Sequence, residues 1–97
     1  SKNLSKLSEL NLNWNFIEED GVRSIVNSEI LQNLTQLTFT YNPIGVGGAK
    51  AIANSSYLSN LTLLDLFEAE VGDAGARAIA ESDKLPNLET LILVFQN

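Results

Sequence analysis

Hydrophobic residues return at a fixed interval along this chain. Leu7, Leu34, Leu61 and Leu88 are spaced 27 residues apart, and no insertion interrupts the series. Apolar and polar residues alternate at the third to seventh positions of each copy, which is typical of a strand with one buried face. We therefore predict four short strands. Their inward residues are Leu10 and Leu12, Leu37 and Phe39, Leu64 and Leu66, and Leu91 and Leu93.

A different apolar spacing follows each of the first three predicted strands. The triplets Val22-Ile25-Val26, Ala49-Ile52-Ala53 and Ala76-Ile79-Ala80 are spaced at i, i+3 and i+4. This spacing predicts helices, each with one apolar face. Gly21, Gly48 and Gly75 precede these faces, and we expect the small residues to allow close packing against the sheet. Gly45 and Gly72 are expected to end the loops between strand and helix, where the backbone freedom of glycine helps.

Copies that are joined through helical crossovers must pair their strands in parallel. We predict an α/β solenoid that curves, with the parallel sheet on its concave face and the wider helices on its convex face. Residues 1–97 would form a single segment, with the end of a preceding repeat at 1–6, full repeats at 7–33, 34–60 and 61–87, and the start of a fourth at 88–97. We expect this segment to belong to a longer array and, as an isolated piece, either to be marginally stable or to self-associate through its uncapped ends.

The copies share the consensus sequence LxxLxLxxNxIGxxGAxAIA, and its second half is clearest in residues 44–53 and 71–80. This consensus sequence resembles leucine-rich repeats of the ribonuclease-inhibitor-like class. Within that class it is most similar to the bacterial GALA-type repeats of effector proteins. The resemblance implies a right-handed βα superhelix that binds another protein on its concave face, within a protein delivered into a host cell.

The same resemblance gives a role to the ninth position of each copy. It implies that Asn15 and Asn42 turn inward and that their amides bind loop backbone of the neighbouring copy. Ala69 replaces the asparagine in the third copy. Because losing such an internal group costs about 1–3 kcal/mol, we expect the loop near Ala69 to be held less firmly.

Composition narrows the range of functions. Twelve acidic residues against six basic ones give a net charge of −6, which disfavours a nucleic-acid partner. The chain has no histidine and no cysteine, so the commonest catalytic bases and nucleophiles are missing, and we predict no enzymatic activity and no cofactor. The missing cysteine also favours a reducing compartment, so we expect a cytoplasmic protein, or one secreted into a host cytosol. No apolar run is long enough to span a membrane.

The candidate binding site follows from the outward positions of the strands and from the eighth position of each copy. The first two strands are polar with one aromatic residue each, whereas the last two would expose large apolar groups. A contiguous apolar patch on a solvent-facing strand surface requires a reason. We predict a site for a partner protein that comprises Trp14, Tyr41, Leu63, Asp65, Phe67, Glu68, Ile92, Val94 and Phe95.

Several alternatives stay open at this point. Later repeats or another domain could cover the patch, the register could shift near residues 68–71, or the segment could be a structural spacer. Trp14 and Tyr41 either hold a partner side chain or pack on each other. The acidic group Asp65, Glu68, Glu70 and Asp73 suits a basic partner better than a calcium ion, because the ordered loop of a calcium site is absent, and we predict no metal site. Arg23, Lys50 and Arg77 are interpreted as a solvated basic stripe on the helices.

Overall fold

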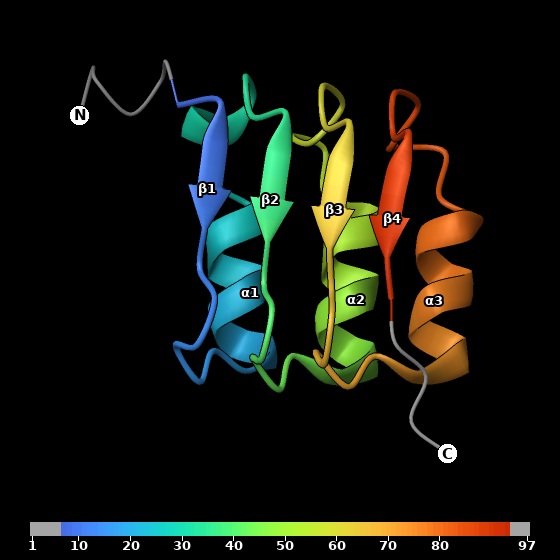
Figure 1. The fold of residues 1–97 in the computed structure, drawn as a ribbon. Helices are drawn as coiled ribbons and strands as arrows, with labels where there is room; N and C mark the ends of the chain where they lie inside the picture. Colours follow the sequence, from blue (N-terminus) through green and yellow to red (C-terminus); the bar gives the residue numbers. More distant parts are fainter. Residues whose placement is uncertain (1–6, 94–97) are drawn as a thin grey trace.

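The computed structural model describes residues 7–93, in which strands and helices alternate (Figure 1). The elements are β1 (Glu9–Asn11), α1 (Glu19–Val26), the 3₁₀ helix η2 (Glu29–Leu31), β2 (Gln36–Thr38), α2 (Gly45–Asn54), β3 (Leu63–Asp65), α3 (Gly72–Ala80) and β4 (Thr90–Ile92). The strands form one parallel sheet in the order β1-β2-β3-β4. The helices cover one face of this sheet and leave the other face open (Figure 1). The predicted α/β solenoid is confirmed.

The strand register follows the sequence period. Glu9 pairs with Gln36, Gln36 with Leu63, and Leu63 with Thr90. The inward residues of β2 and β3 and of the turns after them are fully buried, namely Leu37, Phe39, Leu64 and Leu66. Their counterparts in the outer strands, Leu10, Leu12, Leu91 and Leu93, are half-buried, because these strands have a neighbour on one side only within residues 7–93.

Each strand is shorter than the alternating pattern predicted. The strands cover the third to fifth positions of each copy, not the third to seventh. Bonds between copies continue beyond them, since Leu12 N–H donates to Thr38 O at 3.0 Å and Phe39 N–H donates to Asp65 O at 2.9 Å. The backbone then bends into the turn that leads to the helix, so the regular ladder ends while the inward side chains stay in place.

The predicted helix faces are mostly confirmed. Val22, Val26, Ala49, Ile52, Ala53 and Ile79 are buried. Ala80 is exposed, and Ile25 and Ala76 are half-buried, so the prediction was wrong for Ala80 and partly wrong for the other two. The reason is that α2 packs between α1 and α3, whereas within residues 7–93 each outer helix packs against one neighbouring helix.

Glycine serves two purposes in these copies. Gly45 and Gly72 have φ angles of 69° and 65°, in the left-handed region that glycine tolerates best, as predicted for these loops. A β-carbon at Gly75 would lie 2.8 Å from the Val71 Cβ and 3.0 Å from the Ala49 Cβ. This close approach joins α3 to α2, so the expected packing of Gly75 against the sheet is wrong.

Replacing Gly75 with Ala is expected to lower the free energy of unfolding by about 1–3 kcal/mol, because the added methyl group would overpack the contact between α2 and α3. Urea denaturation followed by far-UV circular dichroism measures the change. Ala74→Ser, at an exposed position of the same helix, serves as the control and should shift stability by less than about 0.5 kcal/mol. If the two variants had the same free energy of unfolding, α2 and α3 would accommodate the added methyl group without a loss of stability.

Polar side chains at equivalent positions form hydrogen bonds between successive copies. They lie on the helical side of the sheet and near the point where its strands begin. Ser55 Oγ donates to Val26 O and Ser82 Oγ donates to Ala53 O, each at 2.5 Å. Thr35 Oγ1 donates to Ser8 O at 3.0 Å, and Thr62 Oγ1 donates to Thr35 O at 3.1 Å. Asn60 and Asn87 donate through their side-chain amides to Gln32 O and Ser59 O. These side chains add hydrogen bonds at the junctions between copies, where Ser8 O and Thr35 O also accept backbone N–H groups of the next copy.

Asn42 forms the strongest of these ties and confirms the inward asparagine expected at the ninth position. It is fully buried, and its Oδ1 accepts the N–H groups of Asn15 and Ile17, each at 2.9 Å. Its side-chain amide donates to Leu12 O at 2.6 Å. Asn15 itself is exposed and its amide binds only Asn13 O at 3.1 Å, so the inward orientation predicted for it is wrong. Within residues 7–93 no preceding loop lies beside it.

Ala69 lacks this amide, but the backbone groups that an asparagine there would bind have other partners. Asn42 N–H donates to Phe39 O at 3.1 Å and Ile44 N–H donates to Asn42 O at 2.8 Å. Gly45 N–H reaches across to Ala69 O at 3.2 Å. The energetic cost expected at Ala69 is therefore reduced, because the loop closes on itself.

Candidate functional site

The turns that follow the strands place large side chains at the surface through an uncommon backbone conformation. Trp14, Tyr41 and Glu68, at the eighth position of successive copies, have φ angles of 63°, 62° and 56°. Phe16 and Glu70, at the tenth position, have φ angles of 55° and 61°. Residues other than glycine rarely adopt this left-handed conformation, which costs roughly 1–2 kcal/mol per residue. Strain of this kind concentrates at functional sites, so these turns are candidates for one.

Three of the aromatic residues form a continuous row, which we call the aromatic ladder: Trp14, Tyr41 and Phe67. Trp14 and Tyr41 stack with ring centroids 3.9 Å apart and an angle of 16° between their planes. Tyr41 meets Phe67 edge to face at 5.5 Å and 78°. The stack nevertheless leaves 67% of Trp14 and 38% of Tyr41 exposed. The two aromatic residues therefore pack on each other and still present a surface to solvent.

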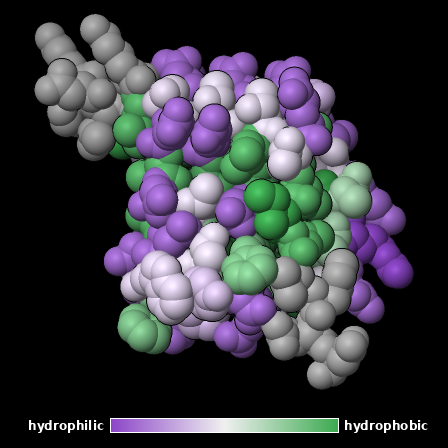
Figure 2. Space-filling view, in the orientation of Figure 1, coloured by the Kyte–Doolittle hydropathy of each residue, from purple (hydrophilic) through white to green (hydrophobic). Residues whose placement is uncertain are grey.

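The open sheet face changes character along the array. Figure 2 shows polar and neutral residues over β1 and β2, and hydrophobic residues gathered over β3 and β4. Ile92 is 37% exposed, and Leu63 and Phe67 are half-buried. The predicted register requires these three side chains to lie outside the interior, and they do. Val94 and Phe95, which also belong to the predicted site, lie outside the described residues.

The acidic members of the predicted site lie beside the aromatic ladder. Asp65 is half-buried, and its Oδ1 accepts the N–H group of Phe67 at 3.0 Å, which holds the carboxylate at the end of β3. Glu68 follows Phe67 and is half-buried. Within residues 7–93 no group of three or more histidine, cysteine or acidic residues is placed to hold a metal ion. The carboxylates are spread along the open face and the adjoining turn, as charges that a partner could meet.

A small pocket on the open face is lined by residues that were not part of the predicted site. It has a volume of about 250 Å³ and lies between β1 and β2, lined by Glu9, Leu10, Asn11, Gln36 and Thr38. The Thr38 Oγ1 is buried and has no hydrogen-bond partner in the described part of the chain. The signal that could have revealed the pocket is the run of oxygen-bearing side chains at the third and fifth positions of the first two copies.

Phe16 is a second feature that the sequence interpretation missed. It is 83% exposed, two residues after Trp14 in the same turn. The tenth position holds proline and glutamate in the next two copies, which are residues typical of a turn surface rather than a core. Comparing that column would have indicated an exposed aromatic residue next to Trp14.

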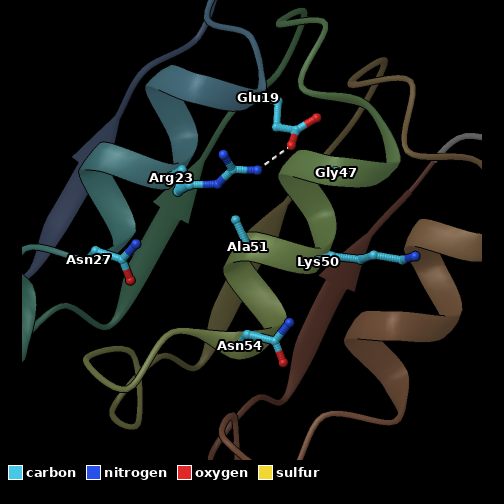
Figure 3. A pocket seen from close by; sticks show the side chains of 7 residues that line it. All are labelled: Glu19, Arg23, Asn27, Gly47, Lys50, Ala51 and Asn54. Atoms are coloured by element: carbon cyan, nitrogen blue, oxygen red, sulfur yellow. Dashed lines mark hydrogen bonds and ion pairs between the residues drawn. The ribbon is translucent and has the colours of Figure 1, made fainter.

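The helical face carries a different kind of pocket (Figure 3). It has a volume of about 330 Å³ and lies between α1 and α2, lined by Glu19, Arg23, Asn27, Gly47, Lys50, Ala51 and Asn54. Arg23 forms an ion pair with Glu19 on its own helix and lies 3.8 Å from Asp20. Lys50 extends away from Arg23 toward α3 (Figure 3). The predicted basic stripe is therefore partly neutralised by acidic residues of α1.

The fold and its surfaces define a solenoid of strand–helix units with one covered and one open sheet face. The family described as Leucine Rich repeat matches residues 3–26, 31–53 and 57–80. The chain belongs to the leucine-rich repeat family, and each matched segment contains one strand and all or nearly all of the helix after it. A comparison with curated proteins finds no match. Leucine-rich repeats are generally protein–protein interaction modules, and the family is typically non-enzymatic. None of the helices in residues 7–93 is long and apolar enough to cross a membrane.

Proposed function

We propose that this chain binds a partner protein on its open sheet face, with the aromatic ladder as the anchor. The observation that carries the proposal is the stacked Trp14–Tyr41 pair, which stays exposed although its rings are held at 3.9 Å. Aromatic residues dominate the energetics of protein interfaces, because they bury a large area at a small cost in conformational entropy. Because the side chains of Trp14 and Tyr41 are already stacked in the free chain, much of their conformational entropy is lost before the partner binds.

The apolar residues beside the ladder extend the proposed interface. Leu63, Phe67 and Ile92 would supply apolar area around the aromatic anchor, and Asp65 and Glu68 would supply charge. An exposed hydrophobic patch with a polar border is typical of a protein-interaction surface. In a longer, curved array this face would be the concave one. A segment that only spaces other domains has no use for such a patch, so the spacer is the weaker alternative.

We further propose that the repeats are ribonuclease-inhibitor-like and GALA-type, within a bacterial effector that acts in a host cytosol. The Gly-Ala-x-Ala-Ile-Ala motif at residues 48–53 and 75–80 supports the subtype. The absence of cysteine fits a reducing compartment such as a host cytosol. A translocation reporter fused to the parent protein tests the location. Reporter signal inside host cells is expected, and signal confined to the producing bacterium would contradict the effector role.

The binding proposal is tested by capture with two double variants of the chain. Trp14→Ala combined with Phe67→Ser should abolish capture of the partner from a candidate cell lysate, because it removes both ends of the aromatic ladder. Arg23→Gln combined with Lys50→Gln changes the helical face and should leave capture intact. Far-UV circular dichroism confirms that both variants are folded.

Three outcomes would count against this site. Capture that survives the loss of Trp14 and Phe67 would place the interface elsewhere. A wild-type chain that captures nothing would favour the spacer. Capture of a second copy alone would assign the apolar surface to self-association, for which the outer side of the first copy offers a pocket of about 240 Å³ lined by Leu7, Leu10, Ile25, Ser28, Ile30 and Leu31. Sedimentation of the purified chain distinguishes this last case.

A further inference from the structure

Within residues 7–93 the basic residues lie away from the open sheet face. In the described part of the chain the basic residues are Arg23, Lys50, Arg77 and Lys84, which lie on the helices or in the loop after α3. The strands and the turns after them, residues 8–15, 35–42, 62–70 and 89–93, contain no lysine or arginine. Glu9 and Asp65 lie on the strands there, and Glu68 follows β3. The open face therefore favours a cationic group and repels an anionic one.

The pocket between β1 and β2 is rich in hydrogen-bond acceptors. Glu9 contributes a carboxylate, and Asn11 and Gln36 each contribute a side-chain carbonyl oxygen. Asn11 Oδ1 already accepts Asn13 N–H at 3.0 Å, which fixes its direction. Thr38 also lines the pocket, and its Oγ1, which has no partner in the described part of the chain, is shielded from solvent. A ligand group with several N–H donors and a positive charge matches this set best.

We propose that this pocket receives the guanidinium group of an arginine that the partner protein presents. A guanidinium carries five N–H donors in a flat fork, so it can meet a carboxylate and neighbouring carbonyl oxygens at the same time. An ammonium group is a compact and strongly hydrated charge, which fits a broad acceptor set less well. The inference rests on the proposed use of the open sheet face and names the side chain that this face selects.

Trp14 and Tyr41 of the aromatic ladder lie in the turns after β1 and β2, the two strands that form the pocket. They follow Asn11 and Thr38 by three residues, so they lie within about 10 Å of those residues. One extended segment of the partner can therefore place its arginine in the pocket and a neighbouring residue on the stacked rings. Arginine also stacks favourably on aromatic faces, so a second arginine suits that position.

The test uses blocked peptides and ¹⁵N-labelled chain observed by NMR. The probe is a pentapeptide with one arginine between two pairs of glycines, and its matched forms carry citrulline or lysine instead. The arginine peptide should shift the amide signals of Glu9, Gln36 and Thr38 with a Kd on the order of millimolar, from the charge and several hydrogen bonds acting together. The citrulline peptide, which keeps the shape and loses the charge, should bind about tenfold more weakly.

Variants of the chain separate the pocket from the overall charge. Glu9→Gln should weaken the arginine peptide about tenfold. Glu29→Gln removes the same charge from η2, at an exposed position away from the sheet, and should leave the affinity unchanged. Both substitutions are at exposed positions and are expected to leave the fold intact.

Three results would overturn the inference: no shift with the arginine peptide up to about 10 mM, roughly ten times the expected Kd; equal binding of the citrulline or lysine peptide; or equal effects of the two glutamate variants. If such a result occurs while Trp14→Ala with Phe67→Ser still abolishes partner capture, only the choice of arginine fails. If capture survives the loss of the ladder, the proposed function itself fails.

Discussion

Replacing Phe39 with Ala is expected to lower the free energy of unfolding by about 3–5 kcal/mol, the usual cost of truncating a fully buried phenylalanine. Phe39 is the largest side chain in the core, and it stands in a column that holds leucine in the other copies, at Leu12, Leu66 and Leu93. Single domains are stable by only about 5–15 kcal/mol in total. The variant should therefore unfold at a much lower urea concentration, as followed by far-UV circular dichroism.

The matched control for Phe39 lies in the same column. Leu12 is half-buried in the outer copy, so Leu12→Ala removes less buried area and should cost about 1–2 kcal/mol. Phe39→Leu restores the residue of the other copies and should cost less than Phe39→Ala, because a smaller cavity remains. If Phe39→Ala and Leu12→Ala destabilise the chain equally, the core is not centred on the second and third copies.

Replacing Asn42 with Ala is expected to lower the free energy of unfolding by roughly 2–4 kcal/mol. The change removes one acceptor and one amide donor that together serve the N–H groups of Asn15 and Ile17 and the carbonyl of Leu12. Leaving a buried polar group without its partner costs about 1–3 kcal/mol, and no side chain nearby replaces the lost amide. Urea denaturation measures the change.

Asn15→Ala provides the comparison, since Asn15 has the same place in its own copy and is exposed. Its amide bonds only to Asn13 O, and its loss should cost less than about 1 kcal/mol. Amide hydrogen exchange gives a second readout, because Asn42→Ala should speed exchange at Asn15 and Ile17. Unchanged protection of those two amides would show that Asn42 does not hold the loop.

The sequence predicted the core more completely than the site. Leu37, Leu64 and Ile52 could be assigned to the interior because each copy repeats the same spacing, so that every column was seen several times. Burial at the ends of the array could not be read in this way. Ala53 and Ala80 share a column, yet Ala53 is buried and Ala80 is exposed, because only Ala53 has a helix on both sides.

The candidate site was only partly predictable. Its outward strand residues, such as Leu63, Phe67 and Ile92, follow from the alternation along each strand, whereas Trp14 and Tyr41 follow from the eighth position of each copy. The stacking of Trp14 on Tyr41 was one of two alternatives left open, and the left-handed backbone beneath the rings was not predicted, because that conformation is uncommon for residues other than glycine. The pocket between β1 and β2 was also missed, since it depends on side chains from two strands and on a hydroxyl that no neighbour satisfies.

The period, the strand–helix alternation and the residues that fill the interior follow from the sequence alone. These properties depend on local spacing and on the requirement that each copy bury the same apolar columns. The contacts between exposed side chains, the polar groups without partners and the close approach of two helices at Gly75 become visible only in the folded chain. Such contacts arise between copies that are one period apart in the chain, and the distances between them are set by packing, which no single copy encodes.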